Sequence, residues 1–214
     1  MKLPPFEYAC PATLTEAVAL LAAHDGDAKA IAGGQSLMPM LAFRMARPSL
    51  LVDLRKLSDL KGIRISDSGV RLGALTRWRD IEDDKRLASV HPLLRAAISH
   101  VAHYQIRNRG TVGGSLAHAD PAAEMPGIAV TCDAEIRVLG AKGERVIPAG
   151  RFFTGALTTT LADDEIIVEA RLPAWPAKRR WGFEELARRR GDFALAGTLL
   201  ERALQRASRC RRRS

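Results

Sequence analysis

The sequence has few aromatic residues and few cysteines, and both shortages exclude classes of protein. Phe, Trp and Tyr together make up 5% of the 214 residues, and no repeated aromatics lie among the basic clusters. A stacking platform for nucleic-acid bases is therefore poorly supported, although a net charge of +9 alone would suit nucleic acid. The 3 cysteines lie far apart and form no CxxC motif, which argues against zinc or an iron–sulfur cluster in this chain and favours the reducing cytoplasm.

Long apolar runs are missing as well. No stretch reaches the roughly 18 apolar residues that a membrane span needs. Residues 1–10 hold a Lys and a Pro-Pro pair without an apolar centre, so they are not typical of a signal peptide. The composition is otherwise ordinary, with 47% hydrophobic and 27% charged residues. We therefore predict a globular, cytoplasmic protein with no transmembrane segment.

Alternating apolar and polar patterns predict an α+β fold. The segment 28–54 is typical of a strand, a glycine turn, a helix over 37–45 capped by Ser36, and a second strand. The pattern does not show whether the two strands are parallel. Residues 104–126 are rich in Gly, Asn, Asp and Pro and predict an irregular connection. The remaining expected elements are hairpins at 63–72 and 134–147, helices at 15–23, 92–102 and 122–130, and a strand at 166–172.

Two Gly-Gly pairs, each closely followed by a Ser, are the most informative feature. We call them the first glycine segment, Ala32-Gly33-Gly34-Gln35-Ser36, and the second glycine segment, Thr111-Val112-Gly113-Gly114-Ser115. Adjacent glycines let backbone N–H groups converge on an anion, and a Ser hydroxyl adds a donor. One such segment alone is more often an ordinary turn. Two of them suit a ligand with two phosphates, and neither is a Walker or GxGxxG motif.

The residues around both segments resemble a known family. The first continues through Leu37-Met38-Pro39-Met40-Leu41 to Leu51-Val52-Asp53-Leu54, and the second lies within the run from Gln105 to Pro121. Both runs are similar to flavin-binding segments of the medium subunits of molybdenum hydroxylases, the carbon monoxide dehydrogenase type that is related to the flavin domain of xanthine dehydrogenase. The resemblance implies a two-part FAD-binding domain of the vanillyl-alcohol oxidase (PCMH) type over 1–173, with subparts of about 1–55 and 56–173.

The resemblance also implies noncovalent FAD, with both glycine segments holding its pyrophosphate. Val101 and Ile167 are expected to form apolar walls, although ordinary core packing explains them equally well. Glu124 stands where the family usually has an Asp that contacts the adenosine part. No catalytic side chain and no metal ligand are expected, because the flavin carries the chemistry. The implied contact residues are Ala32, Gly33, Gly34, Gln35, Ser36, Val101, Thr111, Val112, Gly113, Gly114, Ser115, Glu124 and Ile167.

In this family a large subunit hydroxylates the substrate at a molybdenum–pterin centre. Electrons then pass through the [2Fe–2S] clusters of a small subunit to FAD and on to an external acceptor. The resemblance therefore implies an oxidoreductase subunit that is only the flavin link, with molybdopterin and iron–sulfur clusters in its partner subunits. Two alternatives stay open: a stand-alone flavin oxidase of the same fold group, and a nucleic-acid-binding protein suggested by the arginine clusters alone.

The end of the sequence departs from the family pattern. Residues 191–197 resemble the opening of the family's C-terminal domain, and the match then stops in an Arg-rich run. We expect 178–197 to begin an incomplete C-terminal α+β domain and 198–214 to be a divergent basic tail, as a truncation by frameshift would produce. The alternative is a genuine short helix over 199–207. Truncation predicts exposed apolar surface near Phe183, Leu186, Phe193 and Leu195.

Overall fold

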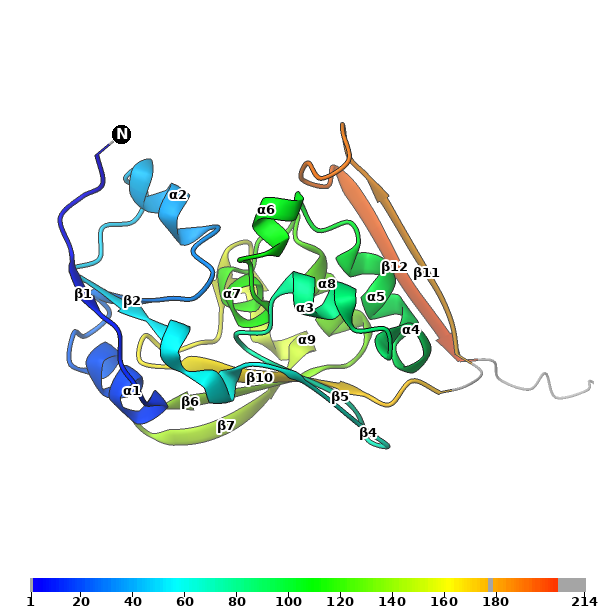
Figure 1. Ribbon diagram of the computed structural model, residues 1–214, viewed down its shortest axis with the longest axis horizontal. Coiled ribbons are helices and arrows are strands. Elements are labelled where there is room, and N and C mark those ends of the chain that lie inside the picture. Colours follow the sequence, from blue (N-terminus) through cyan, green and yellow to red (C-terminus); the bar gives the residue numbers. More distant parts are fainter. Residues whose placement is uncertain (1, 177–178, 204–214) are drawn as a thin grey trace, which may run out of the picture.

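The computed structural model describes residues 2–176 and 179–203, which build two main sheets with their helices (Figure 1). The smaller sheet is three-stranded and parallel. Helix α1 follows its first strand and α2 its second. The predicted unit of strand, glycine turn, helix and strand is confirmed, and its strands are parallel. The helix is shorter than predicted and ends at Ala42, and the predicted cap is wrong, because the Ser36 side chain makes no capping hydrogen bond. In sheet order the strands are β1 (Glu7–Ala9), β3 (Leu50–Asp53) and β2 (Ala28–Ile31), and the helices are α1 (Leu14–Ala22) and α2 (Leu37–Ala42).

The larger sheet is five-stranded and antiparallel, and it contains both predicted hairpins. Its central strand, β10, pairs with β5 on one side and with β6 on the other. In sheet order the strands are β4 (Ile63–Ser66), β5 (Gly69–Gly73), β10 (Ile166–Pro173), β6 (Glu135–Gly140) and β7 (Gly143–Pro148).

Short helices cover one face of the larger sheet (Figure 1). The prediction of an irregular connection over 104–126 is wrong, because α6 and α7 lie within it. Among the described residues no helix is long and apolar enough to cross a membrane. The helices are α3 (Trp78–Asp83), α4 (Leu87–Val90), α5 (Pro92–Ile98), α6 (Tyr104–Arg107), α7 (Val112–His118), α8 (Glu124–Thr131) and α9 (Ala149–Phe152), and the minor elements are η1 (Leu54–Lys56), η2 (Ser58–Leu60), β8 (Phe153–Gly155) and β9 (Thr158–Thr159).

Strand β10 belongs to two hydrophobic cores. Ile166 and Val168 pack in a smaller core with α1, β2 and β3. Ile167 and Leu172 pack in the larger core between the five-stranded sheet and its helices. A β-bulge between Ile167 and Glu169 shifts the register against β6. Successive residues of a strand face opposite sides, so this one buried strand contributes to both cores. It thereby joins the two halves of the molecule, the smaller sheet with its core and the larger sheet with its core.

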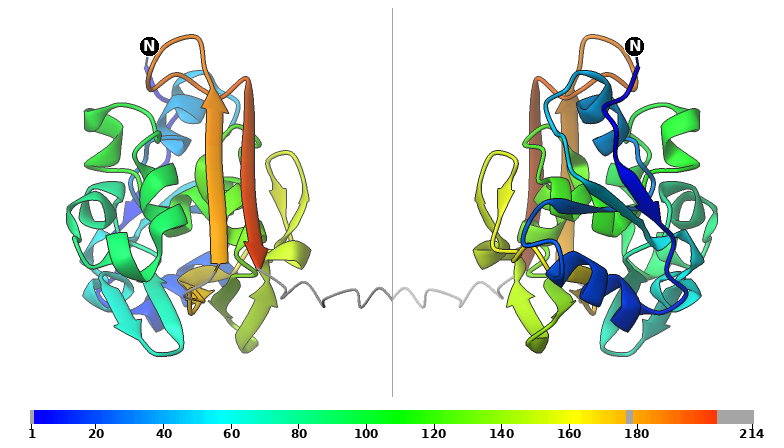
Figure 2. Two further views of the ribbon diagram at one scale, coloured as in Figure 1. Left: turned by 90° about the vertical axis from the view of Figure 1, so that its right-hand side faces the viewer. Right: turned by 90° about the vertical axis from the view of Figure 1, so that its left-hand side faces the viewer.

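A long hairpin, β11 (Arg179–Leu186) and β12 (Ala196–Ala203), lies against the helices at the end remote from the smaller sheet (Figure 2). The alternative of a helix from residue 199 is wrong, because β12 pairs with β11 along its whole length. The expected exposure holds for Leu186, Phe193 and Leu195, which are 64%, 75% and 63% exposed. It is wrong for Phe183, which packs on the larger core with its ring 4.8 Å from the His100 ring. Predictions for 204–214 lie outside the described residues.

Candidate functional site

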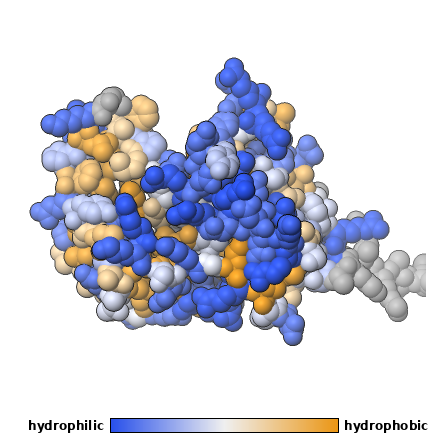
Figure 3. Space-filling view, in the orientation of Figure 1, coloured by the Kyte–Doolittle hydropathy of each residue, from blue (hydrophilic) through white to orange (hydrophobic). Residues whose placement is uncertain are grey.

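A cavity of about 780 Å³ lies where the two halves of the molecule meet. We call it the large cavity. The space-filling view shows the surface hollowed between the region over α2 and the region over α6 and the hairpin (Figure 3). Its walls come from the first glycine segment, residues 101–103 after α5, α7 and the residues that follow it, β10, and the hairpin residues 191–193. Elements far apart in sequence therefore build one site.

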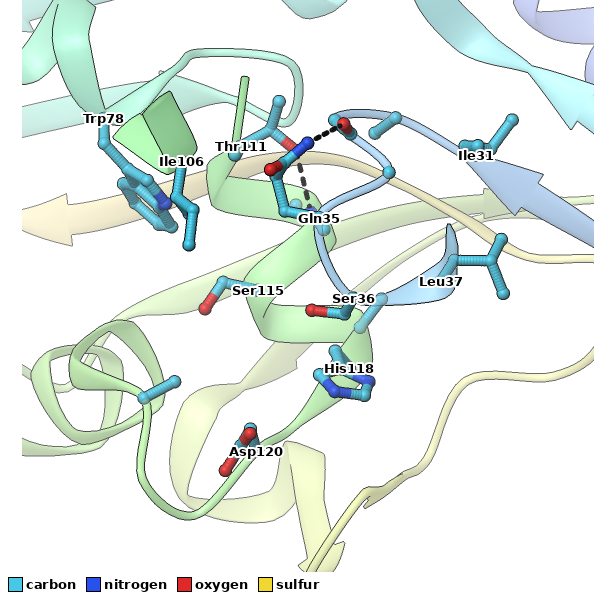
Figure 4. Close-up of a pocket in the computed structure, with 18 of the residues that line it drawn as sticks. Ile31, Gln35, Ser36, Leu37, Trp78, Ile106, Thr111, Ser115, His118 and Asp120 are labelled. Carbon is cyan, nitrogen blue, oxygen red and sulfur yellow. Dashed lines mark hydrogen bonds between the residues drawn. The ribbon is translucent and has the colours of Figure 1, made fainter. Parts of the chain in front are cut away.

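The first glycine segment lines the large cavity and has open backbone hydrogen-bond donors. It leaves β2 and enters α2, and Gly34 has a φ of +72°, a conformation that favours glycine. Within the described part of the chain, the backbone N–H groups of Gly33, Gly34, Gln35 and Ser36 have no hydrogen-bond partner. The Gln35 side chain donates instead to the Gly33 carbonyl at 3.0 Å (Figure 4). Consecutive free N–H groups of this kind form an anion-binding nest.

Gly33 also holds the two halves of the molecule together. A Cβ atom built on Gly33 would overlap the backbone carbonyl of Arg109, so only glycine fits between the two chain segments. Arg109 immediately precedes Gly110 and the second glycine segment. The two glycine segments therefore lie side by side at the cavity. Their similarity in sequence suggested a shared site but could not show that they are neighbours.

The second glycine segment has a different structure. Thr111 is the N-cap of α7, and its hydroxyl accepts a hydrogen bond from the Gly114 N–H at 3.2 Å (Figure 4). The N–H groups of Val112 and Gly113 donate to the carbonyls of Thr76 and Ala74, at 3.0 and 2.8 Å. The expectation that these N–H groups converge freely on an anion is therefore wrong. They already have partners, because the carbonyls of Ala74 and Thr76 and the capping hydroxyl of Thr111 accept the hydrogen bonds that the first turn of a helix leaves open.

The glycines of α7 serve close packing. A Cβ atom on Gly113 would lie 2.7 Å from the Cβ atom of Ala74, and one on Gly114 would lie 2.9 Å from the Thr111 hydroxyl. Gly114 has no positive φ, so its backbone conformation does not require glycine. What this segment offers to the cavity is hydroxyl groups, on Thr111 and Ser115. Figure 4 shows Ser36 of the first segment together with Ser115 and His118 of α7, which all line the cavity.

The two residues predicted as apolar walls both lie at the large cavity. Val101 and Ile167 line it and also belong to the larger core, so core packing and a place at the cavity do not exclude each other. Val112 is the exception among the predicted contact residues: it is fully buried in the larger core and does not line the cavity. Further residues that line the cavity were not predicted from the sequence. Their aromatic or apolar side chains were the only signal that they could contact a ligand. They are Trp78, Ile106, Leu157, Leu161 and Phe193.

The residues that follow α7 bring carboxyl groups to the large cavity. Glu124, the first residue of α8, and Asp120 both line it. Burial raises the pKa of Glu124 to about 7, and the nearby carboxylates of Glu185 and Asp120 add to the effect. Asp120 also accepts a hydrogen bond from the Ala122 N–H at 2.8 Å. The cavity therefore combines anion-binding N–H groups, apolar walls and a carboxyl group that is poised to donate or accept hydrogen bonds near neutral pH.

This arrangement suits binding better than catalysis by side chains. A ligand with a phosphate part and a flat apolar part would find both kinds of wall in the large cavity. Comparison with known proteins agrees with that description. Residues 4–175 match the family model of the FAD binding domain in molybdopterin dehydrogenase.

Individual relatives give the same result. The chain is 42% identical over 212 residues to the 6-hydroxypseudooxynicotine dehydrogenase complex subunit alpha of Paenarthrobacter nicotinovorans, a match that covers 99% of this chain and 72% of the relative. It is 41% identical over 194 residues to the carbon monoxide dehydrogenase medium chain of Hydrogenophaga pseudoflava, covering 91% and 68%. Among solved structures, quinoline 2-oxidoreductase from Pseudomonas putida 86 superposes with a TM-score of 0.91 at 43% identity, covering 96% of this chain and 71% of that one.

Proposed function

The chain belongs to the family of FAD-binding domains of molybdopterin dehydrogenases, and from this premise we propose that it is the electron-transferring flavin subunit of a molybdenum hydroxylase. The predicted α+β, PCMH-type fold and the assignment to the oxidoreductases are confirmed by the family and structural matches. FAD is the cofactor of this family, as predicted. The proposal adds the division into subparts 1–55 and 56–173, which the two sheets and two cores support.

The observation that carries the proposal is the first glycine segment. Its open N–H groups face a cavity large enough for a dinucleotide, at the junction of both halves. In our proposal they hold the FAD pyrophosphate, and the hydroxyls of Thr111 and Ser115 add donors from α7. Val101 and Ile167 exclude water from the flavin, and Glu124 receives the adenosine part. The residues present therefore fit FAD.

Bound FAD supplies a redox centre that takes up electrons singly or in pairs and passes them on. The chain's own contribution is to bind the cofactor, keep water from it and fix its position between partners. We propose that the partners are a [2Fe–2S] small subunit, which delivers electrons, and a molybdopterin large subunit, which acts on the substrate. An external acceptor takes the electrons from the flavin, and the assembly is cytoplasmic. The names of relatives as a complex subunit and as a medium chain support such an assembly.

The test is to purify the whole chain, release any flavin by heat and identify it by chromatography. We expect FAD, because FMN has a single phosphate and no adenosine part for Glu124 to receive. Recovery of FMN alone, or of no flavin after incubation with excess FAD, would overturn the proposal. Copurification of iron and molybdenum from the native host then distinguishes a subunit of a complex from a stand-alone flavin oxidase, which would bring neither metal.

A further inference from the structure

A second cavity, of about 540 Å³, lies against the same glycine segment. We call it the small cavity. Gly33, Gly34 and Gln35 line both cavities, and so does Ile31 of β2. The other walls of the small cavity come from β1, α2, the end of β3 and Arg109. The two cavities therefore meet at the first glycine segment. Apart from the three shared glycine-segment residues, none of the predicted FAD-contact residues lines the small cavity, so its remaining walls are available to a second ligand.

The negative charge in the small cavity is already neutralised. Asp53 is 2% exposed, and its carboxylate accepts three hydrogen bonds. The Tyr8 hydroxyl donates to it at 2.8 Å, the Arg55 backbone N–H at 2.9 Å and the Arg55 Nε at 2.6 Å. This network fastens β1 to the end of β3. It leaves Asp53 with little capacity to bind or repel a further charged group.

Arg109 is the cation that remains. Its side chain is exposed, and the hydrogen bond from its Nε to the Gly33 carbonyl is long at 3.5 Å. It takes part in none of the ion pairs formed among residues 2–176 and 179–203. The neighbouring Arg107 differs, since it donates to Glu82 at 3.3 Å and to two backbone carbonyls at 3.0 and 2.8 Å. Of the two arginines, Arg109 therefore has donors left for a ligand.

The rest of the lining is apolar and partly aromatic. Phe6 and Tyr8 contribute rings, and Met38, Pro39 and Leu51 contribute aliphatic surface. A guanidinium pairs best with a carboxylate, through two parallel hydrogen bonds. Aromatic rings at van der Waals distance favour a flat apolar body. We propose that the small cavity binds an aromatic carboxylate, with its charged group on Arg109 and its ring against Phe6 and Tyr8.

The experiment titrates benzoate into the purified whole chain and follows binding by NMR, with benzamide and acetate as comparison probes. We expect saturable binding of benzoate in the millimolar range, with benzamide and acetate each weaker by roughly tenfold because one lacks the charge and the other the ring. Arg109→Ala should weaken benzoate binding by at least about tenfold, and Arg109→Lys should weaken it less, because Lys keeps the charge without the planar pair of donors.

Arg64→Ala is the matched control, since Arg64 is an exposed arginine that lines neither cavity. It should leave benzoate binding unchanged. Thermal melting and the FAD content of each variant, measured in parallel, show whether the fold and the large cavity are intact. Equal benzoate affinity in Arg109→Ala and the parent chain, equal affinity for benzamide, or no saturable benzoate binding would overturn the proposal. Loss of FAD alone would concern the flavin site, not this one.

Discussion

The two glycine segments are alike in sequence and opposite in structure. The first is a loop with a glycine at positive φ and free N–H groups. The second is the first turn of α7, in which the same N–H groups are already bonded and the glycines allow close packing on Ala74. A Gly-Gly pair before a Ser therefore does not define an anion site. Whether such a pair can bind an anion depends on whether its backbone N–H groups are already hydrogen-bonded to neighbouring segments.

Gly33→Ala should have the largest effect, because it disrupts the contact between the first segment and Arg109, which lies just before the second segment. The new Cβ atom would overlap the Arg109 carbonyl, and a backbone atom cannot move aside cheaply. We expect a loss of about 3 kcal/mol in the free energy of unfolding and a roughly hundredfold loss of FAD affinity. Denaturant titration and flavin fluorescence quenching measure the two. Unchanged FAD affinity would show that the segments do not act as one site.

Gly34→Ala should come next, and it tests the loop conformation alone. At a φ of +72° an alanine is strained, while its Cβ atom would meet only side chains, those of Met38 at 3.2 Å and Ile31 at 3.4 Å. We expect a cost of about 1–2 kcal/mol and a roughly tenfold weaker FAD affinity in a protein that still folds. Calorimetric titration with FAD, with circular dichroism as the check on folding, measures this. A variant that binds FAD normally would show that the N–H nest does not hold the phosphates.

Gly114→Ala should have a smaller effect than either change in the first segment. Its φ is not positive, and alanine is a better helix former than glycine by up to about 1 kcal/mol. The new Cβ atom would crowd only the Thr111 hydroxyl, at 2.9 Å. We expect FAD affinity to fall by less than about fivefold, with unfolding free energy within about 1 kcal/mol of the parent. A loss as large as that of Gly33→Ala would mean that both segments grip phosphate equally.

Glu124→Gln extends the comparison to pH. Burial raises the pKa of Glu124 to about 7 in the folded protein, above its ordinary value of 4.5. The folded state therefore favours the protonated acid, and the stability that this provides is lost as the pH rises through 7. Between pH 5 and 8 the parent should lose about 2 kcal/mol more than Glu124→Gln. Melts across that range measure it, with Gly34→Ala as a control that keeps the parent's pH profile.

The locally determined parts of the fold were predictable from the sequence. The strand, glycine turn and helix from 28 to 42 carry their own signals, and both sheet hairpins are marked by turn residues between alternating apolar ones. Helix α7 could not be predicted this way, because Gly-Gly disfavours a helix. What stabilises it is the Thr111 cap together with contacts to Ala74 and Thr76, which lie far away in sequence.

The candidate site divides in the same way. The first glycine segment and the walls at Val101 and Ile167 could be anticipated from a resemblance. The contact of Gly33 with Arg109, the bonded N–H groups at the start of α7 and the whole small cavity could not. Each depends on two stretches of chain meeting across the molecule. A single sequence holds no local pattern for such a meeting.

The central position of β10 has a consequence for synthesis of the chain. Strand β5 cannot complete its sheet pairing until β10 has been synthesised, because Leu172 pairs with Val70 and Glu169 with Gly73. The smaller core lacks Ile166 and Val168 until the same strand emerges from the ribosome. Neither half can complete its apolar packing earlier, and contacts so distant in sequence form slowly. The nascent chain therefore exposes both unfinished cores to chaperones or to aggregation, and FAD has no finished site to enter until β10 has been made.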